Sequence, residues 1–227
     1  MLSADLLQDA GFAKEVERRL CEARLSEFVR AAWGQLEPGA QYVHGRVIEA
    51  VCEHLEAIAS GELTRLLINI PPGSSKSLTT SVFFPAWLWG PRAQPEMRFL
   101  TASHSEKFAT RDARKMRDLV KSAWFRERWP IELVREGETS FANSATGFRE
   151  AMPFRSLTGA RGDILIIDDP HSTETAESEA ERLRTERIFR ESIPTRLNDP
   201  SRSAIIVIMQ RLHERDVSGI ALEMGYE

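Results

Sequence analysis

Cysteine, lysine and long hydrophobic runs are all scarce in this sequence. It has two cysteines among 227 residues, Cys21 and Cys52, and they form no CxxC pair. Neither a zinc site nor a disulfide framework is therefore indicated, and a reducing compartment is expected. No stretch approaches the roughly 18 uncharged apolar residues of a membrane helix, and the N-terminus lacks a signal-peptide core. These absences predict a soluble, unsecreted protein with no membrane partner.

Net positive charge is also lacking. The formal net charge is -4, so no overall basic field points to a nucleic-acid binder, although a local patch could still serve. The composition, 42% hydrophobic and 28% charged, is that of a globular protein and argues against disorder. The basic residues are almost all arginine, which makes Lys76, one of only five lysines, conspicuous where it follows a loop.

The order of expected elements indicates an α/β fold. Residues 3–33 have the pattern of an N-terminal helical appendage, 37–45 that of a loop, and 46–59 that of an amphipathic helix ended by Ser60 and Gly61. Short apolar runs then alternate with helical stretches, which is typical of a mostly parallel sheet covered on both faces. The expected strands are 65–70, 97–103, 163–169 and 203–210, the expected helices are 77–89, 105–122 and 176–193, and 131–157 is expected to be an inserted hairpin or ribbon.

Residues 66–78, LLINIPPGSSKSL, join one of these strands to a helix through a small polar loop. A phosphate-binding loop needs inward backbone N–H groups at such a junction, a lysine for the β and γ phosphates and a hydroxyl for Mg²⁺. Lys76 and Ser77 supply the last two in that order. Ile70 and Ser75 stand where the GxxxxGK[ST] pattern has glycines, so Ser75 must accept a strained positive φ, at about 1–2 kcal/mol, or sit in an altered loop. An N-capped helix after an ordinary turn remains the alternative.

A second motif, DILIIDDPHS at 163–172, ends an apolar strand in two adjacent carboxylates. Beside a nucleotide, Asp168 would hold Mg²⁺ and Asp169 would orient or deprotonate the attacking water. Taken alone, one aspartate could cap the next segment while the other is solvated. The two motifs together favour an Mg²⁺-dependent ATPase with the fold of a P-loop NTPase.

With both motifs in place, the chain resembles the ATPase domain of phage terminase large subunits, the motors that package viral DNA into procapsids. The resemblance covers most of the sequence after residue 40, through YVHGRVIEAVCEHL, RLLINIPPGSSKS, FRSLTGARGDILIIDDPHS and IPTRLNDPSRSAIIVIMQRLHERDVSG. Two prolines before a compact loop and a pair of aspartates after the later strand are features that it shares with this group. The resemblance implies a RecA/ASCE-like P-loop ATPase domain over 41–227, with 1–40 as the helical appendage.

Site roles follow from the resemblance residue by residue. Lys76 and Ser77 match the Walker A cation and metal ligand, and Asp168 matches the Walker B metal ligand. Asp169 stands where the catalytic carboxylate is expected, with Glu174 as the fallback because aspartate is one methylene shorter than glutamate. The rest of the implied nucleotide loop is Pro72, Gly73, Ser74, Ser75 and Leu78.

The resemblance also implies residues that act on the transferred phosphate. The loop contains no arginine, so Arg161 in TGARGD, with Arg155 as runner-up, is expected to approach that phosphate within its own subunit or in a neighbouring one. Gln210 would sense the γ-phosphate. The RLHERD segment that follows would transmit the nucleotide state, or would simply cap a helix through Asp216.

Adenine and DNA contacts have weaker signals. Gln41 would hold the adenine, whereas Trp33 and Tyr42 are aromatic residues of a kind that more often packs in the core. A basic ladder over 105–126 could contact duplex phosphates without reading bases, or could be a solvated helix face. Its members are Lys107, Arg111, Arg114, Lys115, Arg117, Lys121 and Arg126.

The partners implied are double-stranded DNA, further copies of the chain in a ring, a portal protein and a small terminase subunit, in the cytoplasm of a phage's host. No nuclease activity is expected, because the sequence stops too soon after the last strand for the nuclease domain of a large terminase. A helicase-like ATPase, suggested by DDPH, and a non-catalytic nucleotide-binding assembly module remain alternatives.

Overall fold

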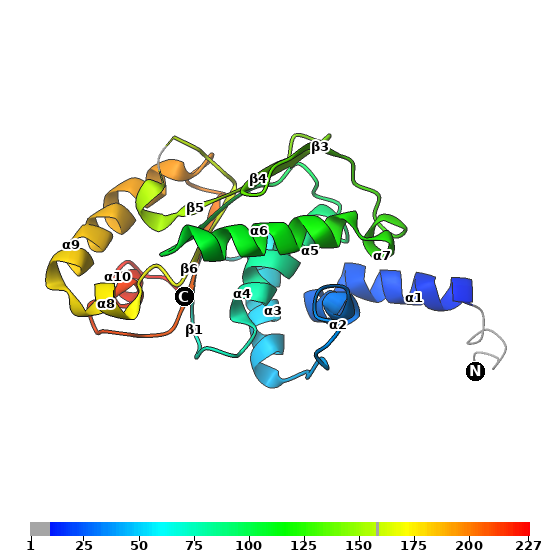
Figure 1. Ribbon diagram of the computed structural model, residues 1–227, viewed down its shortest axis with the longest axis horizontal. Coiled ribbons are helices and arrows are strands. Elements are labelled where there is room, and N and C mark those ends of the chain that lie inside the picture. Colours follow the sequence, from blue (N-terminus) through cyan, green and yellow to red (C-terminus); the bar gives the residue numbers. More distant parts are fainter. Residues whose placement is uncertain (1–9, 158) are drawn as a thin grey trace.

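Nearly continuous apolar strands form the centre of the molecule. In the computed structural model, which describes residues 10–157 and 159–227, seven strands share one sheet in the order β1-β7-β6-β2-β5-β4-β3 (Figure 1). The first five in that order are parallel, and β4 and β3 continue the sheet in antiparallel fashion. The expected mostly parallel α/β sheet is confirmed. The strands are β1 (Arg65–Asn69), β2 (Arg98–Ser103), β3 (Leu133–Glu136), β4 (Ser140–Asn143), β5 (Phe148–Pro153), β6 (Ile164–Asp168) and β7 (Ala204–Met209).

The central strands are apolar because both faces of the sheet are covered. Along β6, Ile164 and Ile166 pack into one hydrophobic core, while Leu165 and Ile167 pack into the other. Strand β7 alternates in the same way, and every one of its residues is buried. Burying a side chain of this kind contributes about 1.5–3 kcal/mol. These two strands therefore fix the position of the loops that follow their carboxyl ends.

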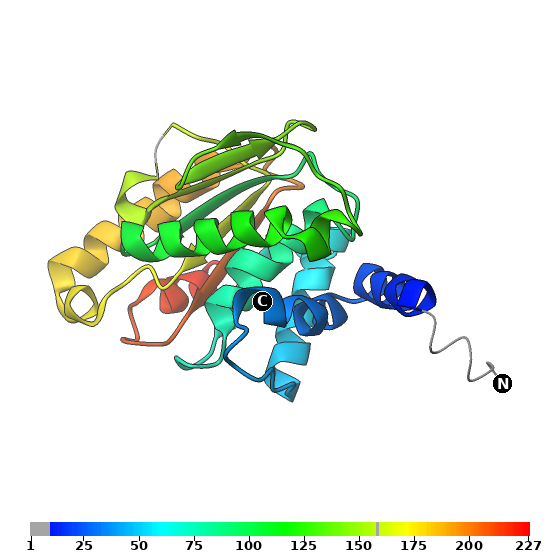
Figure 2. The ribbon, with the colours of Figure 1, turned by 45° about the vertical axis from the view of Figure 1, so that its right-hand side comes forward.

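Helices from separate parts of the chain cover the two faces (Figures 1 and 2). One core is shared with α2 (Leu25–Leu36), α3 (Arg46–Ser60), α5 (Phe84–Trp89), α6 (Glu106–Lys121) and α7 (Ala123–Arg126). The other is closed by η3 (Ile188–Ser192), η4 (Ile193–Arg196) and α10 (Val217–Glu223), with α8 (Thr173–Glu177) and α9 (Glu179–Arg187) leading into them. No helix in the described ranges has both the length and the apolar character that a bilayer crossing requires.

The expected N-terminal helix is two helices, α1 (Ala10–Ala23) and α2, and its part at 3–9 lies outside the described residues. Arg24 breaks it with extended backbone, φ -137° and ψ 133°. The break is held by α3, because Glu49 pairs with the Arg24 guanidinium at 2.6 Å and Glu56 accepts from the Leu25 backbone N–H at 2.6 Å. Figures 1 and 2 show α1 at the edge of the molecule, whereas α2 shares the main core. A domain division at residue 40 stays a prediction.

The expected insertion at 131–157 is part of the main sheet. Strand β5 pairs with β2 in parallel register. Next to β5 in the sheet lie β4 and then β3, which pair as an antiparallel meander. The expected helix over 176–193 is likewise four shorter segments that begin at Thr173, with a break at Ser178, whose side chain caps α9. The segment 131–157 joins the main sheet because β5 pairs with β2. The weak alternation in its sequence does not distinguish a separate ribbon from an added sheet strand.

The helix after the β1 loop contains a π-helical turn. It runs through α4 (Lys76–Leu78), the π-helix η1 (Thr79–Phe83) and α5, and Pro85 lies inside it. Proline has no N–H for the carbonyl four residues earlier, that of Ser81. The guanidinium of Arg149 on β5 donates to this carbonyl instead and also reaches Thr101 Oγ1 at 3.4 Å. Arg149 is fully buried, and burial lowers its pKa to about 10.

Candidate functional site

The loop between β1 and α4 carries strain at the position that the sequence singles out. Gly73 and Ser75 both have left-handed backbone, with φ of 81° and 57°. Glycine adopts this conformation at little cost, whereas serine costs about 1–2 kcal/mol. The Ser74 hydroxyl donates to the Pro71 carbonyl at 2.8 Å and closes the turn. Of the two outcomes open from the sequence, Ser75 accepts the strain, immediately before the helix begins.

Lys76 and Asp169 meet across the end of β7. The Lys76 Nζ lies 2.8 Å from Asp169 Oδ1, and the same oxygen accepts from the backbone N–H of Gln210 at 3.2 Å. Asp169 also has left-handed backbone, with φ of 44°, and its N–H donates to the Ile208 carbonyl at 2.9 Å. Lys76, Asp169 and Gln210, three of the predicted catalytic positions, therefore converge at the carboxyl ends of β1, β6 and β7. Parallel α/β sheets bind ligands at this end of their strands.

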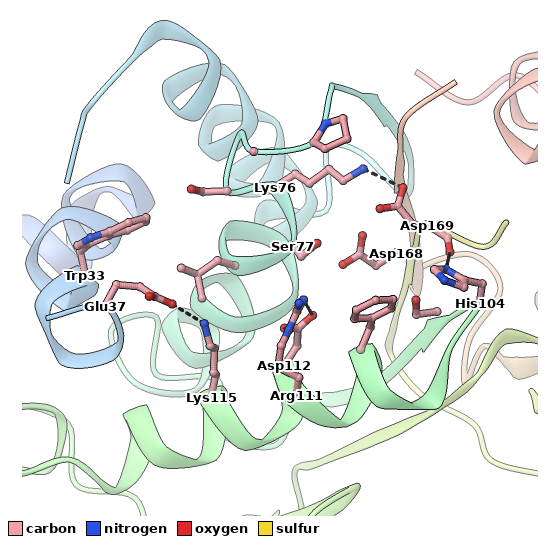
Figure 3. A pocket seen from close by; sticks show the side chains of 16 residues that line it. Trp33, Glu37, Lys76, Ser77, His104, Arg111, Asp112, Lys115, Asp168 and Asp169 are labelled. Atoms are coloured by element: carbon pink, nitrogen blue, oxygen red, sulfur yellow. Dashed lines mark hydrogen bonds and ion pairs between the residues drawn. The ribbon is translucent and has the colours of Figure 1, made fainter. Parts of the chain in front are cut away.

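Asp168 is the buried carboxylate of the site. Its Oδ1 is buried and has no hydrogen-bond partner among the described residues. Burial raises the pKa of Asp168 to about 7, and the nearby Asp169 charge adds to the rise, while the Ser77 hydroxyl and the Lys76 charge oppose it. Figure 3 shows the side chains of Ser77 and Asp168 pointing toward each other, and both line the cavity. A buried carboxylate oxygen without a partner, beside a hydroxyl, indicates a place for a cation.

The donor set fits Mg²⁺ in particular. Within 10–157 and 159–227, no group of three or more His, Cys, Asp or Glu side chains is arranged to hold a metal ion. Mg²⁺ seldom needs such a cage, because it commonly takes one or two protein ligands and completes its shell with phosphate oxygens and water. Ser77 and Asp168 therefore suit a metal that is bound together with a phosphate ligand.

A cavity of about 480 Å³ opens onto these residues (Figure 3). Helix α6 forms its opposite wall with Arg111, Asp112 and Lys115, while α2 contributes Trp33 and is followed directly by Glu37. The sequence did not associate Asp112 or Glu37 with the site, because their α-helices are distant in the chain and carry no motif. Of the predicted loop residues, the lining includes Pro72, Gly73, Ser75, Lys76, Ser77 and Leu78.

His104 is a further residue that the sequence analysis missed. It follows β2, and both its backbone N–H and its ring Nδ1 donate to the Asp169 carbonyl oxygen, at 3.1 and 2.8 Å. These two bonds hold Asp169 in its strained backbone conformation. The available signal was its position after an expected parallel strand, since the carboxyl ends of neighbouring parallel strands meet at one edge of the sheet.

Acidic partners engage several residues of the basic ladder on α6. Arg111 and Lys115 line the cavity, where Arg111 pairs with Asp112 and Lys115 with Glu37. Farther out, Arg114 pairs with Glu138, and Lys121 pairs with Glu136. Lys107, Arg111, Arg114 and Lys115 also share the lining of a second hollow beside α6. Contact of the ladder with duplex phosphates stays a prediction.

Arg161 lies far from the cavity of its own chain. It is exposed just before β6, and its Nε donates to the Thr195 carbonyl at 3.3 Å. Strand β6, which begins at Ile164, spans about 13 Å before it ends at Asp168, at 3.3 Å per residue. Arg161 is not part of the cavity lining of its own chain, and its role within or between subunits stays a prediction. Arg155, the runner-up, is exposed and pairs with Glu181.

Several other predicted residues lie outside the cavity lining. Gln41 is exposed in the loop before α3, and Glu174 is exposed in the first turn of α8. Trp33 lines the cavity and also packs against Tyr42, with 5.3 Å between the ring centroids. The roles of Gln41 in adenine binding and of Glu174 in proton transfer stay predictions.

The segment after Gln210 is organised by Asp216, which is completely buried. Its carboxylate accepts from the backbone N–H groups of Leu212, His213 and Gly219 at 2.9 to 3.2 Å and so caps α10. Its ion-pair partner is Arg211, with Nε at 3.4 Å. The helix-capping alternative for RLHERD is thus present in the structure.

His171, the histidine of DDPH, is directed toward α10. Its Nε2 accepts from the Val217 N–H at 3.2 Å, and burial lowers its pKa, which favours the neutral ring. The residue is buried and is not part of the cavity lining. It therefore connects the segment after Asp169 to the helix that Asp216 caps.

Comparison with known proteins gives a likeness of fold. No family model matches the sequence, and no curated protein matches it. Among solved structures, the chain is similar to the large terminase ATPase domain of a Thermus phage, solved as an arginine-to-alanine mutant. The TM-score is 0.50 at 15% sequence identity, over 79% of this chain and 68% of that one. The fold that the resemblance implied is confirmed by this similarity.

Proposed function

We propose that this chain is the ATP-hydrolysing motor domain of a phage terminase large subunit, which drives double-stranded DNA into a procapsid. The observation that carries the proposal is the convergence of Lys76, Ser77, Asp168 and Asp169 at one cavity. The fold likeness to a phage terminase ATPase domain supports it independently. The proposed ligands are ATP and Mg²⁺.

The first step is an exchange of partners at Lys76. In the structure its side chain is only 7% exposed and its ammonium pairs with Asp169. The phosphates of ATP would take over this cation, and the loop N–H groups before α4 would supply further donors. Ser77 and Asp168 would hold Mg²⁺, which when bound neutralises charge on the β and γ phosphates.

Asp169 is then free to act on water. A water oxygen attacks the γ phosphorus, the bond from that phosphorus to the β–γ bridging oxygen breaks, and ADP leaves with the electron pair. The water proton passes to the Asp169 carboxylate and then to solvent. His104 holds the Asp169 backbone carbonyl and the Gln210 N–H donates to the Asp169 carboxylate, so the position of Asp169 does not depend on Lys76 alone.

Assembly into a ring would bring a second subunit's arginine to the site. Arg161 is exposed at the end of the sheet opposite the cavity, so in this proposal it contributes across a subunit boundary. This arrangement supports a ring of identical chains as the working form. A portal protein, a small terminase subunit and the cytoplasm of the phage's host complete the proposed setting.

One observation favours a second candidate, a nucleotide-binding assembly module without turnover. Ser75 takes a left-handed conformation that the standard loop assigns to glycine, and its strain could mark a site that has lost catalysis. Such a module would bind ATP through Lys76 and release no phosphate.

The experiment that tests the motor proposal is steady-state ATP hydrolysis as a function of protein concentration, with and without duplex DNA. Turnover that rises more than linearly with concentration, is stimulated by DNA and falls in Arg161→Ala supports an assembled motor. Binding of ATP without phosphate release at any concentration favours the non-catalytic module. An absence of nucleotide binding contradicts both.

A further inference from the structure

Arg111 lies at the cavity from a helix that no nucleotide motif marks. It comes from α6, and its side chain is 49% exposed, so its guanidinium is open to a ligand. Figure 3 shows Arg111 and Asp112 extending from α6 toward Ser77 and Asp168. Asp112 raises the pKa of Arg111 most, and the charge of Asp168 adds to the rise, which agrees with this placement.

The guanidinium of Arg111 is held in a defined orientation. Its Nε and Nη2 donate to the two oxygens of Asp112, at 2.8 and 3.1 Å. The Asp112 side chain is only 6% exposed, so the anchor is fixed in the wall of the cavity. The Phe108 ring lies 5.3 Å from the guanidinium carbon and supports one face of it. A guanidinium has five N–H donors, and within the described residues only these two hydrogen bonds engage it.

Phosphoryl transfer from ATP needs positive charge on the equatorial oxygens of the γ-phosphate, and arginine commonly supplies it. Residues 71–75 contain no arginine, and Arg161 is not part of the cavity lining of its own chain. Lys76 is one cation at the cavity, and Lys115 is committed to Glu37 in the part of the wall next to Trp33. Arg111 is the arginine that shares the lining of this cavity with Lys76, and it also borders a second hollow with Lys107 and Arg114.

We propose that Arg111 binds the γ-phosphate of ATP in its own subunit and stabilises the charge that moves to the bridging oxygen as the γ phosphorus is transferred to water. Arg111 is thus a catalytic residue, and Asp112 is a positioning residue that acts through it. The inference rests on the proposed ATPase function. It assigns to α6 a role in the chemistry of its own chain, distinct from any arginine that a neighbouring subunit contributes.

The test compares Arg111→Ala and Arg111→Lys with wild type in two assays, nucleotide affinity and steady-state hydrolysis without DNA. The matched control is Arg190→Ala, which removes an arginine held by two carboxylates, Glu186 and Glu223, beside the core on the opposite face of the sheet. Circular dichroism and thermal melting verify that each variant folds. Affinities are measured separately for ATP and ADP with Mg²⁺ present.

The proposal predicts that Arg111→Ala lowers kcat by at least about 10²-fold, as expected for loss of a transition-state donor. It also predicts that the variant loses the preference of the wild type for ATP over ADP, while its ADP affinity changes less than about threefold. Arg111→Lys restores little turnover, because an ammonium lacks the fork that Asp112 orients. Asp112→Asn lowers kcat less than Arg111→Ala and leaves KM nearly unchanged, and Arg190→Ala matches wild type.

Two results overturn the inference while leaving the ATPase proposal intact. These are wild-type turnover in Arg111→Ala, and an unchanged preference for ATP over ADP in that variant. If wild type binds ATP but never hydrolyses it, the affinity comparison still decides whether Arg111 contacts the γ-phosphate. A wild-type protein that binds neither nucleotide contradicts the ATPase proposal and the role of Arg111 together.

Discussion

The ammonium of Lys76 lies 2.8 Å from a carboxylate oxygen of Asp169. One residue follows β1 and the other follows β6, with the end of β7 between them. Without nucleotide, the cation assigned to phosphate binding and the carboxylate assigned to proton transfer therefore satisfy each other. Under the proposed function, ATP binding would break this pair, so the pair would both organise the site and oppose the ligand.

Asp169→Asn should therefore separate binding from chemistry. Removing the carboxylate charge frees Lys76 and is expected to tighten ATP binding by roughly five- to tenfold, which corresponds to a partly exposed ion pair of about 1 kcal/mol. The same change should lower turnover by about 10²–10⁴-fold, because the amide cannot accept the water proton. Calorimetric titration and a phosphate-release assay on the same preparation measure the two effects. Weaker ATP binding in Asp169→Asn would contradict the proposed competition.

Asp168 predicts a pH dependence of stability for the metal-free protein. Its folded-state pKa of about 7 lies above the ordinary aspartate value of about 3.9, because burial disfavours the ionised form. The unfolded chain binds fewer protons than the folded one between these values, so stability falls as pH rises from about 4 to about 7. Asp168→Asn should remove this loss. The stability of the variant minus that of the wild type should therefore be larger at pH 8 than at pH 5.

Urea unfolding in the presence of a chelator measures the difference at the two pH values. Saturating Mg²⁺ at pH 8 should stabilise the wild type more than the asparagine variant, since the ion binds the deprotonated carboxylate. A wild-type stability that is flat from pH 5 to pH 8, or that rises, relative to the variant would count against a buried, protonated carboxyl group at this position.

Ser75→Gly tests the strain in the loop. Glycine relieves about 1–2 kcal/mol of left-handed strain in the folded state. It also makes the unfolded chain more flexible, which offsets part of this gain, so the free energy of unfolding is expected to rise by about 0.5–1 kcal/mol. Ser74→Gly is the matched control, because Ser74 lacks a positive φ and its hydroxyl bonds to Pro71, so it should destabilise. Chemical denaturation of both variants gives the sign, and a destabilised Ser75→Gly would contradict the strained conformation.

Asp216→Ala should destabilise the fold by about 2–4 kcal/mol. The carboxylate caps α10 and satisfies three backbone N–H groups from a fully buried position, and alanine satisfies none of them. Asp216→Asn keeps an oxygen for part of this set and should lose less. Thermal and urea unfolding of the pair provide the comparison, and equal stability of the two variants would argue against the capping role.

The local patterns of the sequence predict the elements of this fold well where a residue's fate depends on its neighbours in the chain. The apolar run before Asp168 becomes a buried strand, and Gly61 ends α3 in left-handed conformation with φ of 80°, as the C-terminal signal predicts. The break at Arg24 was missed because its cause lies on α3, in Glu49 and Glu56. The residue pattern of one helix cannot predict contacts with a helix that lies elsewhere in the chain.

The same distinction holds for the site. Lys76, Ser77, Asp168 and Asp169 were identified from two local motifs, and the structure brings them together. The other wall of the cavity was not foreseen, because Arg111 on α6 looks like any exposed arginine until the sheet order places α6 beside Ser77. Arg161 was placed by resemblance, and only the direction of β6 shows that it lies at the far end of the sheet.

The most direct test of the account is Mg²⁺-dependent phosphate release from ATP by the wild type, by Lys76→Ala and by the matched control Lys14→Ala. Lys14 is an exposed lysine on α1 that pairs with Glu127 away from the cavity. The account predicts turnover in the wild type and in Lys14→Ala that a chelator abolishes, and none in a folded Lys76→Ala. Equal turnover in all three proteins, or turnover that survives the chelator, would contradict it.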